Sequence, residues 1–323
     1  MRIILWNFAC MKNSYHICVS GGDEVYCRDE EDYIYCFNAL ALAIHATQSS
    51  LLADSIMSTH LHECVRSENP DLLVKMQRYT YVRYFNRKYH RKGGLGEPNA
   101  FVVKLDGLYH NLAAISYTLR NALHHGVSPT PFAYPHSSAQ TVFRKELGRY
   151  AEPELMPKFG QHNFLPYRTK CPDGYRMGRN GLILREDVVD TADVEHLFGT
   201  PRSFLYYMNR ISGEEWQREQ EKDGAGIDPI NLDVIENGVK HHSVAEMLSN
   251  ERGRNDFRKM DDLELCTYID KILLPEMGGE SVYTLSRSEK DSTANLLKKS
   301  LHLPYDQICR CLAMSYEPKI RRR

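Results

Sequence analysis

Apolar positions in the first half of the chain follow two spacings, which predict strands and helices in alternation. Short runs rich in β-branched and aromatic residues favour strands, whereas apolar residues that recur every three or four positions favour helices. Strands are expected at 15–20, at 51–65 as one strand or two, and at 100–105. Helices are expected at 33–47, 71–89 and 108–124. Strand, helix and strand in succession predict an α/β sandwich.

The second half has a mainly helical pattern. An irregular connector with a short hairpin is expected at 162–184, and a linker at 223–228. Helices are expected at 187–198, 201–221, 261–274, 286–300 and 305–314. Ser286 and Glu289 form the capping-box pattern that opens the second-last helix, and Pro304 suits the first turn of the last one.

The last two predicted helices and the short turn between them resemble a helix-turn-helix unit. Its second helix carries 307–310 (QICR), where a DNA-recognition helix would contact bases. A small helical bundle gives the same pattern, so both interpretations stay open, with DNA contact favoured. The basic end of the chain, 319–323 (KIRRR), would add charge suited to phosphate.

Composition narrows the class of protein. The 323 residues, a length that favours two domains, are 42% hydrophobic and 26% charged, as in ordinary soluble globular proteins. The net charge is −1, so any attraction to nucleic acid must come from local patches. The chain has no apolar run long enough for a membrane helix, and its first residues lack the pattern of a signal peptide. Nine scattered cysteines without a CxxC pair favour reduced thiols and a cytoplasmic location.

Two histidines, His60 and His62, flank a leucine within an apolar run. In a β-strand these two side chains would project from the same face, with Cα atoms about 6.6 Å apart, and could converge on one cation. A hydrogen-bonded core histidine is the more frequent explanation of such a pattern. The metal interpretation therefore depends on further ligands elsewhere in the chain.

The predicted helix at 71–89 and the turn after it are strongly basic. No acidic residue lies between Leu72 and Gly96, and aromatic residues are interleaved with the cations. The cations are Lys75, Arg78, Arg83, Arg87, Lys88, Arg91 and Lys92. Basic side chains follow phosphates and aromatic rings stack on unpaired bases, so nucleic-acid contact is favoured over a solvated helix face.

Two other pairs of side chains suggest chemistry. Tyr117 and Asn121 lie four residues apart in the predicted helix at 108–124 and are neighbours on one face, although such a tyrosine is usually a packing residue. His241 and His242 are adjacent, and adjacent residues share no face of a strand or a helix. We therefore expect that pair at the surface and not at a metal.

The order of these motifs over about residues 15–140 resembles one family. The motifs are 15–20 (YHICVS), 29–33 (DEEDY), 57–62 (MSTHLH), the basic helix and its glycine, 116–121 (SYTLRN), 124–129 (HHGVSP) and 133–138 (AYPHSS). This chain is similar to the single-tyrosine HUH transposases, in particular the REP-associated tyrosine transposase branch. It differs at Ser58 and Thr59, where the family has proline and asparagine, and at Ala122 and Leu123, where the family has proline and valine.

The resemblance implies an α+β fold, with an antiparallel sheet flanked by helices, ferredoxin- or RRM-like, in a catalytic domain at 10–145. The rest of the chain is expected to be mainly helical from its own pattern. It is divided into a connector and helical region at 146–228 and a helical region with the helix-turn-helix pattern at 229–323.

The resemblance further implies a DNA transposase that cuts and rejoins single-stranded DNA near hairpins, as a monomer or a homodimer. Tyr117 would attack the phosphate and form a 5′-phosphotyrosine. His60, His62 and the amide oxygen of Asn121 are neutral ligands suited to Mg²⁺ or Mn²⁺ with positions left open for substrate. His16 could support this site, although a core or surface histidine is the more common interpretation.

Two alternative functions stay open at the level of sequence. One is a DNA-binding regulator with weak or no cleavage activity, for which Ser58 and Thr59 are the hint. The other is an RNA-binding module, because RRM-like sheets with aromatic residues suit either nucleic acid.

Overall fold

The computed structural model describes residues 12–209 and 260–316. Its centre is a four-stranded sheet of β1 (Asn13–Ser20), β2 (Ser50–Ile56), β3 (His60–Ser67) and β4 (Phe101–Leu105). The strand order is β2-β3-β1-β4, and every neighbouring pair is antiparallel. With α1 (Glu30–Ala46) after β1 and α2 (Pro70–Lys88) after β3, this is the ferredoxin-like order of elements. The predicted α+β class with an antiparallel sheet is confirmed.

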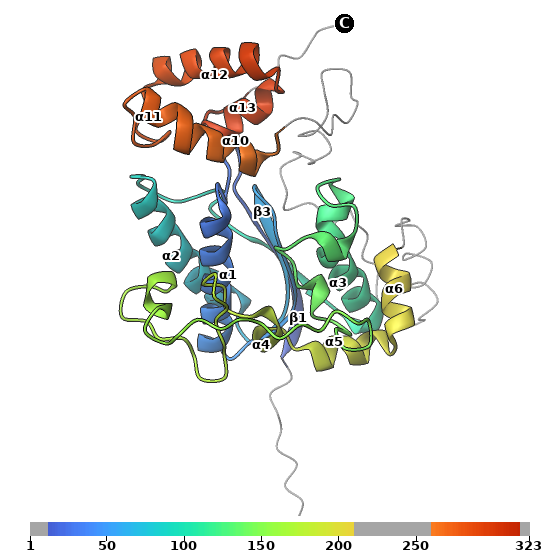
Figure 1. Ribbon diagram of the computed structural model, residues 1–323. Coiled ribbons are helices and arrows are strands. Elements are labelled where there is room, and N and C mark those ends of the chain that lie inside the picture. Colours follow the sequence, from blue (N-terminus) through green and yellow to red (C-terminus); the bar gives the residue numbers. More distant parts are fainter. Residues whose placement is uncertain (1–11, 210–259, 317–323) are drawn as a thin grey trace, which may run out of the picture.

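Helices cover both faces of the sheet (Figure 1). On one face α1 and α2 pack against Ile17, Leu61 and Val65. On the other face α3 (Gly107–His124) packs against Leu52 and Cys64. Alternation along β3 therefore turns Leu61 toward α1 and α2, and turns His60 and His62 toward α3.

Local sequence signals set the ends of these helices. Asp29 and Asp32 form a capping box at the start of α1. Asn69 caps α2, and Pro70 occupies its first turn, where a missing N–H costs nothing. The predicted range 51–65 contains two strands, because the chain turns at 57–59 between β2 and β3.

The segment after α3 packs around the sheet. Its 3₁₀ turns are η1 (Pro131–Ala133), η2 (Ser138–Gln140) and η3 (Gln161–Phe164), and its helices are α4 (Arg185–Val188), α5 (Thr191–Phe198) and α6 (Pro201–Asn209). Leu165 and Ile183 join the core beneath α1, whereas Phe198 and Phe204 join the core beneath α3. The connector therefore contributes to the cores on both faces of the sheet.

The prediction of one helix at 187–198 is wrong. The chain breaks between α4 and α5 because the backbone N–H of Asp190 donates to the oxygen of Leu51 in β2, at 2.8 Å. The Asp190 side chain then caps α5 by accepting from the N–H of Asp193. Of the helix predicted at 201–221, the described part is α6. The rest of it, the linker at 223–228, the pair His241 and His242, and the basic end at 319–323 lie outside the described residues.

The C-terminal helices form a separate small core at one end of the sheet (Figure 1). They are α10 (Asp262–Tyr268), the π turn η4 (Ile269–Leu273), α11 (Leu274–Glu276), α12 (Arg287–Leu301) and α13 (Tyr305–Cys311). The predicted capping box at Ser286 is present. The predicted end of the 261–274 helix is wrong, since the π turn leads directly into α11 and Pro275 lies inside the helical run. The domain boundaries at 145–146 and 228–229 stay predictions.

The helix-turn-helix prediction fails at its second helix. Gln307, Ile308, Cys309 and Arg310 are all buried in α13, so none of them can read a base edge. Arg310 instead donates to both carboxylate oxygens of Asp262 in α10, at 3.0 and 3.1 Å. The pattern therefore belongs to the small helical bundle that was the alternative.

Candidate active site

The space between β3 and α3 brings together the four residues with the predicted catalytic roles. His60 Nε2 lies 3.3 Å from Asn121 Oδ1, and Asn121 Nδ2 donates to the Tyr117 hydroxyl oxygen at 3.4 Å. The Tyr117 ring stands edge-on to the His62 ring, with 5.2 Å between centroids. Two periodicities produce this cluster: alternation places both histidines on one face of β3, and the i, i+4 spacing places Tyr117 and Asn121 on one face of α3. The roles of these residues stay predictions.

The cluster is buried. His60, His62 and Asn121 have no exposed surface, and Tyr117 is 3% exposed. Burial lowers the pKa of His62 well below its ordinary value, and the nearby His60 lowers it further. His62 is therefore neutral at pH 7, and the neutral imidazole is the form that binds metals.

Each histidine of the pair is held through its Nδ1 atom. The Thr59 hydroxyl lies 3.0 Å from Nδ1 of His60, and Nε2 of His16 lies 3.1 Å from Nδ1 of His62. Such bonds fix the orientation of an imidazole and leave the Nε2 atom for other contacts, which for His60 include Asn121 Oδ1. Nε2 of His62 is buried and has no hydrogen-bond partner among the described residues.

These atoms fit a small divalent cation. His60 Nε2, His62 Nε2 and Asn121 Oδ1 are three neutral donors from two elements, and the unpartnered nitrogen would gain a partner on binding. Within 12–209 and 260–316 no group of three or more His, Cys, Asp or Glu residues is arranged to hold a metal. A ligand set at this place would therefore need an amide oxygen, and Asn121 Oδ1 lies beside His60.

Two supporting residues were not recognised from the sequence in these roles. Thr59 was noted only as a departure from the family pattern, and His125 only as part of a motif. His125 lies edge-on to His60, with 5.5 Å between ring centroids, and burial lowers its pKa to about 2. His16, considered as a possible support, does contact the site through His62. The signal for Thr59 was its position directly before the first histidine.

The turn at 57–59 is fixed from the C-terminal region. The Ser58 hydroxyl donates to Asp262 of α10 at 3.0 Å. The backbone oxygen of Ser58 accepts from the N–H groups of Tyr26 and Cys27. Ser58, which directly precedes Thr59 and His60, is therefore anchored on two sides.

The structure divides the basic segment into exposed and engaged cations. Lys88 forms ion pairs with Asp29, Glu31 and Asp32, and Arg91 pairs with Glu24. The segment has no acidic residue of its own, but acidic residues from 24–32 pair with these two cations, so the prediction that they contact nucleic acid is wrong for both. The other engaged cation is Arg78, which donates to three backbone oxygens. Lys75, Arg83, Arg87 and Lys92 are exposed.

The aromatic residues of this segment divide in the same way. Tyr81, Tyr84, Phe85 and Tyr89 are buried in the core with α1, so they are not available to stack on bases. Tyr79 is 63% exposed. The predicted stacking surface on α2 is therefore reduced to Tyr79 and the cations around it.

Comparison with solved structures finds a likeness to a REP-associated tyrosine transposase bound to a REP hairpin. The match covers 44% of this chain and 84% of that chain, with 12% identity and a TM-score of 0.35. No known protein family and no curated protein matches the sequence. The likeness is too distant to support conclusions about individual residues. No described helix is long and apolar enough to cross a membrane.

Proposed function

We propose that this chain cuts and rejoins single-stranded DNA through Tyr117 with the help of a divalent cation. The observation that carries the proposal is the hydrogen-bonded series from His60 through Asn121 to Tyr117, beside Nε2 of His62, which has no hydrogen-bond partner among the residues that the structure describes. In this proposal Tyr117 is the nucleophile, and the neighbouring nitrogen and oxygen atoms would hold Mg²⁺ or Mn²⁺. Such an ion would polarise a phosphate oxygen and stabilise the charge that develops on it.

The chain's own residues position the nucleophile. Asn121 Nδ2 donates to the Tyr117 oxygen, which orients the phenol and would stabilise negative charge on it. Attack of that oxygen on a DNA phosphate forms the bond from tyrosine to phosphorus and breaks the bond from phosphorus to the 3′ oxygen. The proton that Tyr117 loses ends on the 3′ oxygen, which leaves as a hydroxyl, and the 5′ phosphate stays on Tyr117. A second 3′ hydroxyl reverses the step, so rejoining needs no ATP.

Replacement of Tyr117 tests the nucleophile. We expect Tyr117→Phe, incubated with a hairpin oligonucleotide and Mn²⁺, to form no covalent protein–DNA adduct on a denaturing gel. Tyr109→Phe removes a hydroxyl from the same helix outside the site and should form the adduct as the wild type does. An adduct with Tyr117→Phe would show that another residue attacks.

A DNA-binding protein without cleavage activity is the second candidate. Tyr117 is 3% exposed, so a DNA strand reaches it only if neighbouring atoms move. The adduct assay with the wild-type protein separates the two candidates, because a protein that only binds DNA forms no covalent adduct. An RNA-binding module of the RRM type is less well supported. Such modules stack bases on the sheet face that carries no helices, and here α3 covers the face opposite α1 and α2. Matched DNA and RNA hairpins test that preference.

A further inference from the structure

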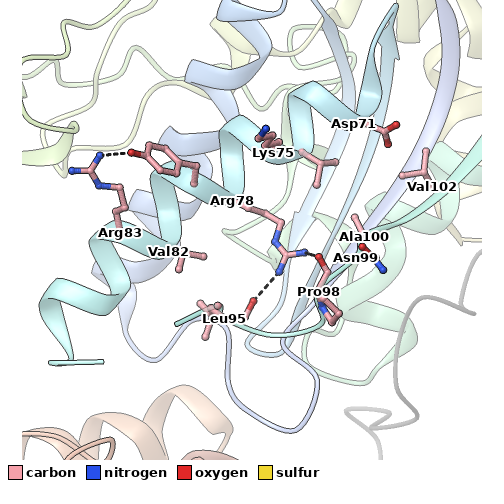
Figure 2. A pocket seen from close by; sticks show the side chains of 13 residues that line it. Asp71, Lys75, Arg78, Val82, Arg83, Leu95, Pro98, Asn99, Ala100 and Val102 are labelled. Atoms are coloured by element: carbon pink, nitrogen blue, oxygen red, sulfur yellow. Dashed lines mark hydrogen bonds between the residues drawn. The ribbon is translucent and has the colours of Figure 1, made fainter. Parts of the chain in front are cut away.

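A pocket lies on the α1–α2 face of the sheet, opposite the face that carries His60 and His62. It opens between α2, the loop at 94–99 and β4, with a cavity volume of about 620 Å³ (Figure 2). Its apolar lining consists of Val74, Val82, Leu95, Pro98, Ala100 and Val102. Small-molecule sites commonly have volumes of roughly 300 to 1,000 Å³ and a mainly apolar lining with few polar groups. The cavity therefore has the size and the character of a ligand site.

Arg78 connects the two walls of this pocket. Its guanidinium group crosses from α2 to the loop and donates to the backbone oxygens of Leu95 and Pro98, at 3.0 and 2.9 Å (Figure 2). It also donates to the backbone oxygen of Glu97, at 2.6 Å. These bonds hold the loop at a fixed distance from the helix. A preformed site loses less conformational entropy on binding than one that must first be assembled.

The rim of the pocket suits an anion. Lys75 and Arg83 are exposed, and neither forms an ion pair among the described residues. They lie eight positions apart on α2, which is about 12 Å along a helix and enough to contact different phosphates. Asp71, in the first turn of α2, is the acidic residue of the pocket lining. Cations therefore predominate around an apolar cavity.

Tyr79 provides a stacking surface at the same rim. Its ring is 63% exposed, so it is accessible to a ligand. Arg83 donates to its hydroxyl at 2.8 Å and lies over the ring, with 5.1 Å to the centroid. The ring is therefore held at the mouth of the cavity, next to the cation that would meet a phosphate.

We propose that this pocket binds one unpaired nucleotide of a single-stranded nucleic acid. The base would stack on Tyr79 and enter the apolar cavity, and Lys75 and Arg83 would hold the neighbouring phosphates. A flat aromatic base that is linked to a phosphate through its sugar matches a site with an exposed tyrosine ring, an apolar lining and a cationic rim. This inference deepens the proposed function and rests on it for one point, that the ligand is a nucleic acid.

The test measures binding by the full-length protein without divalent metal, so cleavage does not contribute. The probes are a fluorescent single strand and a strand of equal length with abasic residues, which keeps the phosphates and removes the bases. We expect the wild type to bind the base-containing strand about tenfold more tightly, as expected from one stacked base. Tyr79→Ala should reduce that ratio, and Val82→Trp, which fills the cavity, should abolish it.

Charge variants test the rim separately. Lys75→Ala and Arg83→Ala should weaken binding of both strands, each lowering the slope of log affinity against log salt by about 0.7. Lys158→Ala removes an exposed lysine outside the pocket and is the matched control. Thermal melting of every variant shows whether it is folded. If Val82→Trp does not fold, Tyr79→Ala still tests the pocket, because it changes an exposed side chain.

Three results would overturn the proposal. One is equal affinity of the wild type for the two strands, and another is an unchanged ratio in both pocket variants. The third is an acidic peptide that competes through the same side chains, which would assign the pocket to a protein partner. A covalent adduct with Tyr117→Phe would contradict the catalytic proposal and leave this result intact, because the binding assay involves no cleavage.

Discussion

At the scale of single residues, the hydroxyl of Thr59 is expected to set the metal affinity of His60. It contacts Nδ1 of His60 at 3.0 Å, and contacts of this kind orient an imidazole and fix which nitrogen carries the proton. Thr59→Val keeps the shape and removes the hydroxyl. We expect it to weaken Mn²⁺ binding by about 10- to 100-fold, measured by electron paramagnetic resonance titration.

Thr59→Ser restores a hydroxyl and is the matched control, which should bind Mn²⁺ nearly as the wild type does. Imidazole nitrogen chemical shifts should show a changed tautomer of His60 in Thr59→Val alone. Equal Mn²⁺ affinity of the valine and serine variants would mean that Thr59 contributes only to packing.

Prediction from sequence succeeded at this scale where spacing alone decides toward which face of a strand or helix a side chain points. Alternation in a strand was enough to place His60 and His62 on one face, and helical spacing was enough to pair Tyr117 with Asn121. The contacts of Thr59 and His16 depend on side-chain rotamers and on the register of β1 against β3, which pairs Cys18 with His62. No local pattern encodes that register, so these contacts needed the structure.

At the scale of elements, the cations of α2 and of the turn after it are expected to have two separable functions, stability of the fold and contact with DNA. Lys88 lies over the buried Asp32, which also accepts from the hydroxyls of Tyr84 and Tyr89. Lys88→Met would leave that carboxylate without its cation, and we expect a loss of about 1 to 3 kcal/mol in the free energy of unfolding. Chemical denaturation provides the measurement.

Lys92→Met is the counterpart of this variant. Lys92 is exposed and follows α2, so its removal should leave stability within about 0.5 kcal/mol of the wild type. It should instead weaken single-stranded DNA binding and lower its salt dependence. If Lys88→Met reduced DNA affinity without a loss of stability, the division of the basic segment would be wrong.

Element-scale prediction failed where a distant partner decides. The helix at 187–198 breaks because its backbone bonds to Leu51, and the QICR helix is buried because Arg310 pairs with Asp262, which lies 48 residues earlier. The helices α1, α2 and α3 were predicted within a few residues, since the caps of α1 and α2 and the apolar spacing of all three are local. Sequence reasoning therefore gave the elements of the sheet domain and missed what the C-terminal helices bury.

At the scale of the whole molecule, Arg28 connects the sheet domain to the C-terminal helices. Its guanidinium is fully buried and donates to both carboxylate oxygens of Asp270 and to the backbone oxygen of Cys311, each at 2.8 Å. Removal of one partner of a buried ion pair leaves the other without compensation. We expect Arg28→Leu to cost about 3 to 5 kcal/mol in the free energy of unfolding.

The position of α10 extends this prediction to the site. Because Asp262 in α10 accepts from the Ser58 hydroxyl, loosening the C-terminal helices should also loosen the turn before Thr59 and His60. Hydrogen exchange should therefore rise in Arg28→Leu both at 260–316 and at 57–60, and Mn²⁺ affinity should fall. Arg287→Leu removes an exposed pair with Asp291 and should change none of these quantities by more than a small amount. Increased exchange confined to 260–316, with unchanged Mn²⁺ affinity, would show that the C-terminal helices do not support the site.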